Sequence, residues 1–107
     1  MAGRMTLKML IVDDEPLICQ GLATTIPWQE MGIEIAGSAI NGKQAMEIIK
    51  RESVDIVITD VNMPEMDGIE LSRAIVEHFP DVSIIMISGY DEFDYALQAL
   101  RIGVKDY

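Results

Sequence analysis

Residues 55–68 read DIVITDVNMPEMDG, and this stretch is the one that decides the fold class. Its first part, DIVIT (55–59), is a run of apolar and β-branched residues with the length of a buried strand. The run ends abruptly at Asp60, and the six-residue loop V-N-M-P-E-M separates this carboxylate from the next helical pattern. A buried strand that delivers a charged side chain to its own end predicts a functional edge in a sheet of parallel strands.

The same alternation of strand and helix patterns continues on both sides of this stretch. Asn41 with Gln44, and Asp67 with Glu70, predict helix starts closed by capping boxes. Further strands are predicted at LKMLIV (7–12), IEIAGSA (33–39) and VSIIMIS (82–88), and helices at 16–26, from Asn41 to about 51, from Asp67 to about 78, and from Asp91 to about 102. PWQEMG (27–32) is predicted to be a connector.

Apolar residues at helical spacing predict the packing faces of the first two helices. They are Leu17, Ile18, Leu22 and Ile26 in the first helix, and Ala45, Ile48 and Ile49 in the second. Strands that alternate with helices of this length imply βαβ units with right-handed crossovers. The predicted fold class is therefore α/β, an open doubly wound parallel sheet covered on both faces.

Length and composition limit what the chain can be. Its 107 residues are enough for one domain, and half of them are apolar. No apolar run reaches the roughly 20 residues that cross a bilayer, and no secretory signal is evident, so we expect no membrane contact and a cytoplasmic location. The single cysteine, Cys19, lies in an apolar helix and predicts a buried thiol. With 18 Asp and Glu against 8 Lys and Arg, the net charge of −10 argues against direct binding of nucleic acid.

Acidic residues follow two of the predicted strands. Asp13, Asp14 and Glu15 come after the first strand, and Asp60 comes after the third. If these strands are neighbours, at least three carboxylates converge, and their repulsion requires compensation by a hard divalent cation such as Mg²⁺. The alternative is that Asp13, Asp14 or Glu15 caps the helix that begins at Pro16. Capping does not explain Asp60, whose following helix already has its own cap.

The first turn also excludes several nucleotide folds. Its sequence, DDEP, repels anions, whereas a P-loop, a dinucleotide site or a flavin site needs glycines or hydroxyls there. Ser88 ends the fourth strand at the same edge and is predicted to donate to a phosphate oxygen, although an ordinary turn residue is the alternative. His78 is interpreted as a helix C-terminal residue that suits the helix dipole.

In combination and order, LIVDDEP, DIVITDVNMPEMDG, ISGY and GVKDY resemble the receiver domain of bacterial two-component response regulators. The pattern that also includes PWQEMG and SGYDEFDYA is most similar to receivers attached to AraC-type helix-turn-helix domains. The resemblance spans residues 7–107 and leaves 1–6 as a disordered start or a cloning remnant. It implies the flavodoxin-like strand order 2-1-3-4-5. It also implies a signalling module that controls transcription through a separate DNA-binding domain, and not a turnover enzyme.

The resemblance implies a role for each matching acid. Asp60 would be the phosphoacceptor, taking the phosphoryl group from a phosphohistidine of a sensor histidine kinase. Asp14 and Asp60 would ligate Mg²⁺ directly, together with the backbone carbonyl of Asn62, and Asp13 would act through a metal-bound water. Phosphoryl transfer of this kind needs positioning and charge neutralisation more than a strong nucleophile.

The end of the chain departs from the family pattern. Ser88 and Tyr107 match the family residues that change conformation when the domain is phosphorylated. The lysine that normally follows the last strand is absent, because Lys105 precedes Asp-Tyr and does not follow it. We therefore expect a truncated fifth strand, no last helix, and an output domain C-terminal to this chain. An uncovered fourth strand would favour self-association.

Two other functions fit part of the pattern. An aspartate-nucleophile phosphatase of the haloacid dehalogenase type needs a second acid two residues after the nucleophile, where this chain has Asn62. It also needs a downstream lysine and a cap insertion. A receiver-like binding module that no longer responds to phosphate is the other alternative.

Overall fold

The computed structural model describes residues 6–61, 63 and 66–87. Three predicted site residues, Asn62, Ser88 and Tyr107, lie outside these described residues, as do the predicted helix at 91–102 and any fifth strand. No helix of the described part combines the length and the apolar character that a membrane span requires.

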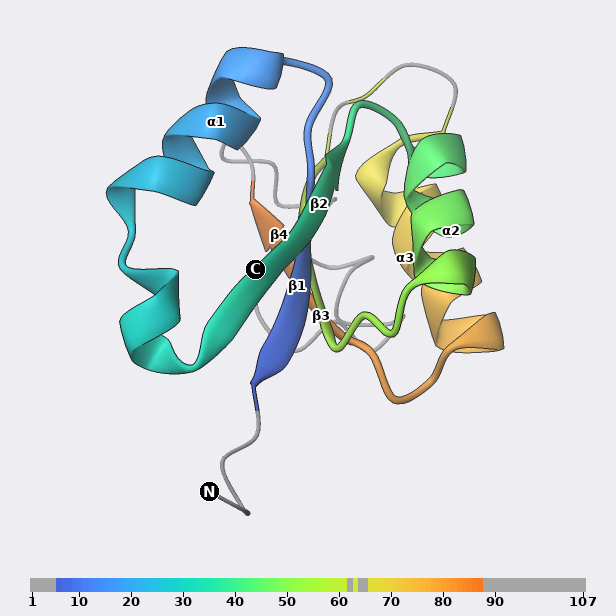
Figure 1. Ribbon diagram of the computed structural model, residues 1–107. Coiled ribbons are helices and arrows are strands. Elements are labelled where there is room, and N and C mark those ends of the chain that lie inside the picture. The colour runs from blue at the N-terminus through green and yellow to red at the C-terminus, as the bar shows by residue number, and fades with distance from the viewer. Residues whose placement is uncertain (1–5, 62, 64–65, 88–107) are drawn as a thin grey trace.

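Four parallel strands form one sheet in the order β2-β1-β3-β4. The strands are β1 (Leu7–Val12), β2 (Ile33–Ala39), β3 (Ile56–Asp60) and β4 (Ser83–Ile87), and the α-helices are α1 (Pro16–Thr25), α2 (Gly42–Arg51) and α3 (Gly68–His78). Helix α1 covers one face of the sheet, and α2 and α3 lie together on the other (Figure 1). The predicted α/β class and the receiver-type order are confirmed for these four strands.

The bounds of β3 differ from the prediction by one residue. The strand includes Asp60 and leaves out Asp55, with which the predicted strand began. The Asp55 carboxylate instead accepts a hydrogen bond of 2.8 Å from the backbone N–H of Lys8, at the amino ends of the strands. The backbone of Asp55 also bonds to Lys8 at 2.8 Å and to Ser83 at 2.9 Å, so Asp55 lies just before β3 and ties its start to β1 and β4.

The segment predicted as a connector contains a 3₁₀ helix, η1 (Trp28–Met31). The helix ends at Gly32, whose φ of 78° is left-handed and suits glycine. Trp28 is buried, and its indole Nε1–H donates to the carbonyl of Leu22 at 2.7 Å. This turn closes the end of α1 against the sheet.

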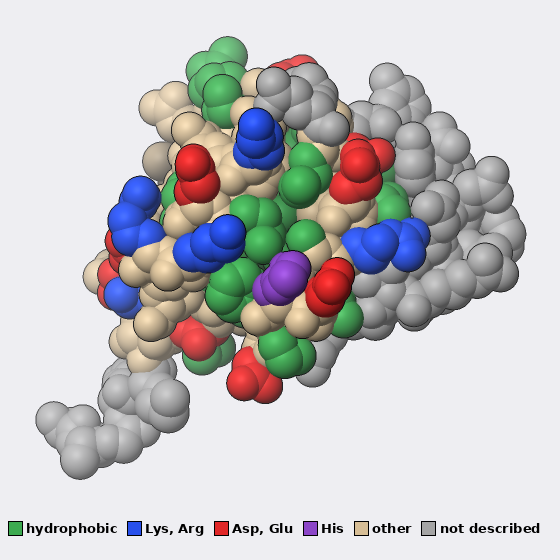
Figure 2. Space-filling view, turned by 90° about the vertical axis from the view of Figure 1, so that its right-hand side faces the viewer, with side chains coloured by type: hydrophobic (Ala, Val, Ile, Leu, Met, Phe, Trp, Pro, Cys, Tyr) green, Lys and Arg blue, Asp and Glu red, His purple; other side chains and the backbone are tan. Residues whose placement is uncertain are grey.

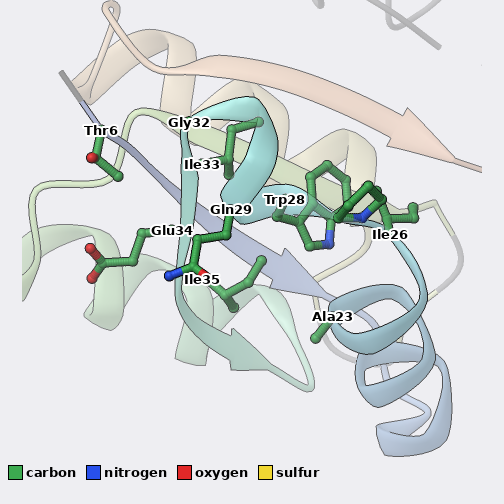
Figure 3. A pocket seen from close by; sticks show the side chains of 10 residues that line it. Thr6, Ala23, Ile26, Trp28, Gln29, Gly32, Ile33, Glu34 and Ile35 are labelled. Carbon is green, nitrogen blue, oxygen red and sulfur yellow. The ribbon is translucent and has the colours of Figure 1, made fainter. Parts of the chain in front are cut away.

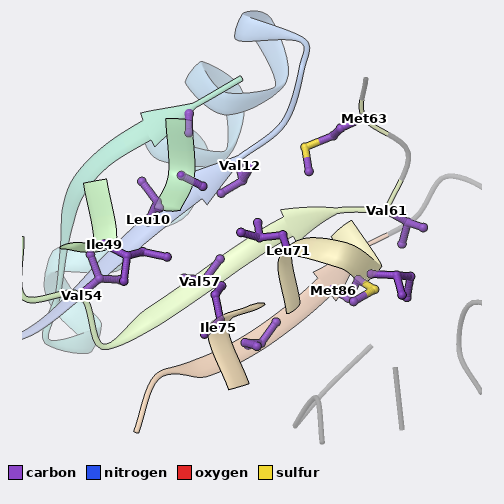
Figure 4. Close-up of a cluster of buried hydrophobic side chains, with 14 residues drawn as sticks. Leu10, Val12, Ile49, Val54, Val57, Val61, Met63, Leu71, Ile75 and Met86 are labelled. Carbon is purple, nitrogen blue, oxygen red and sulfur yellow. The ribbon is translucent and has the colours of Figure 1, made fainter. Parts of the chain in front are cut away.

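Two apolar clusters fill the two faces of the sheet. The larger lies between the sheet and helices α2 and α3 (Figure 4), with Leu10, Val57, Leu71, Ile75 and Met86 among its fully buried members. The smaller lies under α1 and contains Met9, Ile11, Cys19, Trp28 and Ile58. The predictions of a buried Cys19 and of a packing face at Ala45 and Ile49 are confirmed.

The predicted packing face of α1 is only half right. Leu22 and Ile26 pack against the smaller cluster, but Leu17 is 79% exposed and Ile18 is 42% exposed. Cys19, which the apolar spacing had not placed at the centre of the face, is the buried residue of this helix. The apolar residues of the first turn of α1 are thus on the surface, and the buried side of the helix begins at Cys19.

The predicted caps are confirmed, with one difference. Asp67 and Glu70 form the full capping box of α3, with bonds of 2.8 and 3.2 Å. At α2, Asn41 Oδ1 accepts from the N–H of Gln44 at 2.8 Å, but the Gln44 side chain accepts from Ile40 and not from Asn41. The Gln44 side chain thus bonds the N–H of the residue that precedes the cap.

Gly68, the first residue of α3, allows the helix to touch the end of β3. Its N–H donates to the carbonyl of Val61 at 2.8 Å. A Cβ at this position would collide with the carbonyl oxygen of Asp60 and would lie 2.9 Å from the Cα of Val61. Only glycine permits this approach, so the start of α3 is placed directly against the backbone of Asp60.

We expect Gly68→Ala to lower the free energy of unfolding by about 2 kcal/mol, because the backbone must move to admit the methyl group. Gly21→Ala is the matched control, since a Cβ at Gly21 in α1 meets nothing within 4 Å. That change should stabilise the chain slightly through helix propensity. Urea unfolding of both variants checks the prediction, and equal effects would contradict the close packing described for Gly68.

Candidate functional site

The strand register brings the predicted acids to one edge of the sheet. Val12, at the end of β1, is the partner of Thr59 in β3, so the next residues along the two strands, Asp13 and Asp60, are neighbours. Asp13, Asp14 and Asp60 each offer a carboxylate oxygen, and these oxygens all lie within 4.8 Å of one another. The convergence predicted from the sequence is therefore found.

Each of the three carboxylates has a different environment. Asp13 is buried, with 5% of its surface exposed, Asp60 is half-buried, and Asp14 is exposed. The cluster thus has a closed floor at Asp13 and an open side at Asp14, where solvent or a ligand has access.

Two hydrogen bonds to backbone groups fix the position of Asp13. Its N–H donates to the carbonyl of Ala39 at 3.0 Å, and its Oδ1 accepts from the N–H of Glu15 at 2.9 Å. Glu15 is the N-cap residue of α1 but makes no side-chain capping bond. The capping alternative is therefore partly right for Asp13, which steadies the start of α1, and no described capping bond involves Asp14.

Asp60 is fixed at the end of β3. The N–H of Val61 lies 2.8 Å from Asp60 Oδ1 and also 3.2 Å from the carbonyl of Ile87 in β4. The Thr59 hydroxyl donates to the Asp60 carbonyl at 3.0 Å. With Gly68 against the same carbonyl, the strand end and its carboxylate have a defined orientation.

Burial and neighbouring charge act together on Asp13. Burial is the main cause that raises the pKa of its carboxyl above the ordinary value of 3.8, and the charges of Asp60, Asp14 and Glu15 raise it further. The hydrogen bond from Glu15 opposes this by stabilising the ionised form. At neutral pH the cluster therefore stores electrostatic repulsion that a bound cation would relieve.

The donor set fits a hard divalent cation. Three carboxylates can supply oxygen ligands from two strand ends, and the open side leaves room for water and a phosphate oxygen. Within the described residues no cysteine or histidine belongs to this group, which argues against zinc. Magnesium is the cation that this chemistry favours.

Asp13→Asn should raise the melting temperature of the metal-free chain by about 5 °C, the shift that about 1 kcal/mol produces in a domain of this size. Asparagine keeps the oxygen that accepts from Glu15 and removes the buried charge. A carboxyl whose pKa is raised on folding loses its stabilising contribution as pH rises through that pKa. The gain should therefore be larger at pH 7 than at pH 4, as differential scanning calorimetry can measure. A loss of stability at pH 7 would contradict this electrostatic account.

A separate hollow lies at the opposite edge of the sheet. It has a volume of about 730 Å³ and is lined by residues of α1, η1 and β2, including Ala23, Trp28 and Ile35 (Figure 3). Thr6 and Gly32, which precede β1 and β2, place it at the amino ends of the strands. It contains no part of the acidic cluster, and we assign it no role in the chemistry of that site.

Comparison with known proteins identifies the class. Residues 9–107 match the family model of the response regulator receiver domain. Over 100 residues the chain is 45% identical to the uncharacterized transcriptional regulatory protein YesN of Bacillus subtilis, a match that covers 94% of this chain and 27% of that protein. The chain thus spans about a quarter of the length of this curated relative.

Two solved structures are similar throughout. The receiver domain of AraT, a response regulator from Geobacillus stearothermophilus, is 42% identical with a TM-score of 0.89, covering 96% of this chain and 80% of that one. The structure of a CheX-CheY-BeF₃-Mg²⁺ complex from Borrelia burgdorferi is 30% identical with a TM-score of 0.84, covering 94% and 75%.

The chain belongs to the response regulator receiver family. Members of this class are phosphoacceptors and not turnover enzymes, which decides against the phosphatase alternative. The acidic cluster at Asp13, Asp14 and Asp60 is consistent with the phosphorylation site of such a domain.

Two features of the site were not predicted from the sequence. Gly68 is the first, although a glycine at the first position of a helix, directly after a cap, is a signal of close backbone approach. The second is the exposure of Leu17 and Ile18, which were predicted to lie on a packing face but are on the surface beside the acidic edge. Their position in the first turn after DDEP was the available clue.

Proposed function

We propose that this domain accepts a phosphoryl group on Asp60 from a sensor histidine kinase, in a reaction that depends on Mg²⁺. The observation that carries the proposal is the approach of three carboxylate oxygens to within 4.8 Å at the carboxyl edge of the sheet. Family membership supports the phosphoacceptor role. The similarity to the Borrelia complex, which contains BeF₃ and Mg²⁺, supports the same chemistry.

In the proposed reaction an Asp60 carboxylate oxygen attacks the phosphorus of a phosphohistidine. The phosphorus–nitrogen bond breaks, the imidazole leaves with its electron pair, and an acyl phosphate forms on Asp60. The Val61 N–H, bonded to Oδ1, limits rotation of the carboxylate and so keeps it in line with the incoming group. Gly68 holds the backbone at Asp60 in the same way.

Asp14 and Asp60 would hold the cation directly, with the Asn62 carbonyl as a further ligand, and Asp13 would act through water. When bound, Mg²⁺ supplies neutralisation of the carboxylates and of the phosphoryl oxygens. The buried Asp13 keeps negative charge at the floor of the site, while the exposed Asp14 lies on the side open to the donor. Ser88 and Tyr107 are proposed to respond to the acyl phosphate.

A protein donor needs a surface to contact beside the acids. Leu17 and Ile18 in the first turn of α1, and Ile40 after β2, are exposed apolar residues near the same edge. A hollow of about 260 Å³ lies between α1 and β2 and is lined by Pro16 and Ile40. We assign the kinase to this apolar rim, because exposed apolar side chains around a charged site favour protein contact over small-molecule access.

Because the chain spans only part of its relatives, the output is also proposed. Transcription control through a DNA-binding domain outside this chain is supported by the name of the YesN relative. The net charge of −10 makes direct DNA contact by this domain unfavourable.

Incubation with acetyl phosphate and Mg²⁺, followed by intact-mass spectrometry, tests the proposal. One phosphoryl group per chain, stable for minutes and hydrolysed in alkali as an acyl phosphate is, would support it. Absence of labelling would favour a receiver-like binding module, and rapid loss of the label through many turnovers would contradict a stable acyl phosphate on Asp60.

A further inference from the structure

Helices α2 and α3 lie side by side and leave a groove on the outer surface of the molecule (Figure 2). The groove has a volume of about 590 Å³, which is within the range of binding sites. It lies on the face of the sheet opposite α1, so it is separate from the apolar rim that we assign to the kinase.

The floor of the groove is apolar and adaptable. Met46, Met66, Ala74 and Phe79 line it, and all except Ala74 are partly buried residues packed against the larger core cluster. Methionine side chains adjust readily to different partners. The floor therefore suits a bulky apolar side chain from another molecule.

Helix α2 is positively charged in a chain that is acidic as a whole, with Lys43, Lys50 and Arg51 against Glu47, whereas α3 has Arg73 against Glu70 and Glu77. The two helices together hold half of the eight lysines and arginines of the chain. Figure 2 shows several Lys and Arg side chains (blue) around a green apolar area on this face, with Asp and Glu side chains (red) among them. An acidic partner therefore meets less repulsion here than on the acidic rest of the protein, and Lys43 and Lys50 are the groove residues that can attract it.

The two lysines that line the groove, Lys43 and Lys50, can form ion pairs with a partner. Lys43 and Lys50 line the groove and make no ion pair within the described residues, whereas Arg51 pairs with Glu52 at 3.8 Å. They are seven residues apart on α2, or two turns, which is a rise of about 10 Å along the same side. Glu47 lies between them in sequence, and His78 of α3 also lines the groove.

We propose that the α2–α3 groove is a docking surface for an acidic amphipathic helix of a protein partner. Apolar side chains of that helix contact the Met46, Met66 and Phe79 floor, and two carboxylates one heptad apart reach Lys43 and Lys50. The heptad spacing of the lysines matches a helix laid along the groove. The apolar floor favours this partner over a nucleic acid, which would need cations without an apolar surface. Docking here does not require phosphorylation of Asp60.

The test uses a fluorescent 16-residue model helix with a leucine row flanked by glutamates, and a second peptide in which lysines replace the glutamates. We expect the acidic peptide alone to bind, with NMR shift changes confined to α2, α3 and Met66 in the ¹⁵N-labelled chain. Binding should weaken as salt is raised, because the attraction is electrostatic. A duplex oligonucleotide of equal charge should not compete.

Lys50→Glu and Arg51→Glu provide the matched pair. Both change the net charge equally in the last turn of α2, but only Lys50 lines the groove. Lys50→Glu should weaken binding about tenfold, because it replaces a charge that pairs directly with the peptide. Arg51→Glu should weaken binding less than about twofold, because Arg51 does not line the groove. Met46→Ser should weaken binding in either salt condition. Melting curves show whether each variant is folded.

Several results would overturn the proposal. Equal loss in the two charge variants would mean that the attraction is not specific to the groove. Equal binding of the lysine peptide, shift changes at α1, or competition by the oligonucleotide would each assign binding to another surface or another partner. Absence of binding at millimolar peptide would remove the docking site altogether, without affecting the labelling expected at Asp60.

Discussion

Replacing Asp60 with asparagine should abolish covalent labelling by acetyl phosphate while leaving the domain folded. The amide has no anionic oxygen to attack phosphorus, but it keeps the Oδ1 that accepts from Val61. It also removes one of the charges that repel Asp13, so the melting temperature should stay the same or rise. The expected loss is complete, because no other carboxylate of the cluster ends a strand before the N-M-P loop.

Asp67→Asn is the control for this experiment. Asp67 lies in the same loop region, and asparagine also serves as a helix cap, so labelling should be unchanged. Intact-mass spectrometry and peptide mapping report both variants. Undiminished labelling of Asp60→Asn would sink the assignment of the phosphoacceptor.

Magnesium should stabilise the folded domain, and Asp14→Asn should remove most of this effect. A ligand at 100 times its dissociation constant that binds only the folded state adds about 2.7 kcal/mol to the free energy of unfolding. Without a cation the three carboxylates repel one another, so the gain is measured against a destabilised reference. Urea unfolding with and without MgCl₂ measures the difference directly.

Glu15→Gln is the matched control for Asp14. Glu15 is its exposed neighbour, loses the same charge on substitution, and does not belong to the three-carboxylate cluster. It should retain the response to Mg²⁺. If both variants responded as the parent does, Asp14 would not be a ligand, and if the parent itself did not respond, the metal site would be wrong.

The sequence was sufficient for the parts of the fold that local chemistry dictates. The strand ends at Asp13 and Asp60 could be placed because a buried apolar run stops at a charge, and the α3 cap because Asp67 and Glu70 satisfy each other. From the parallel order alone the two strand ends could be expected to meet. Which residues become neighbours there is determined by the register, which pairs Val12 with Thr59. The register depends on backbone hydrogen bonds that no single residue encodes.

Other features depend on contacts between distant segments. Leu17 and Ile18 have the spacing of a core face, yet they are exposed, because helical spacing does not show which turns of a helix are covered. Asp55 lies one residue before β3, and its carboxylate accepts from the N–H of Lys8, a residue distant in sequence. The Gln44 side chain accepts from Ile40 and not from Asn41, and the residue types do not determine which of these two N–H groups it bonds.

The pairing of β1 with β3 has a consequence for the order of folding events. The hydrogen bond between Lys8 and Asp55 joins positions 47 residues apart, and the acidic cluster lies at the far end of the same two strands. Such distant pairing is slow to form, because a long loop must close first. Until it forms, Asp13 and Asp60 belong to separate parts of a flexible chain and share no cation. The effect of Mg²⁺ on the folding kinetics therefore reports when β1 and β3 pair. If Mg²⁺ accelerates refolding, the two strands are already paired in the rate-limiting transition state. If Mg²⁺ only slows unfolding, they pair after it.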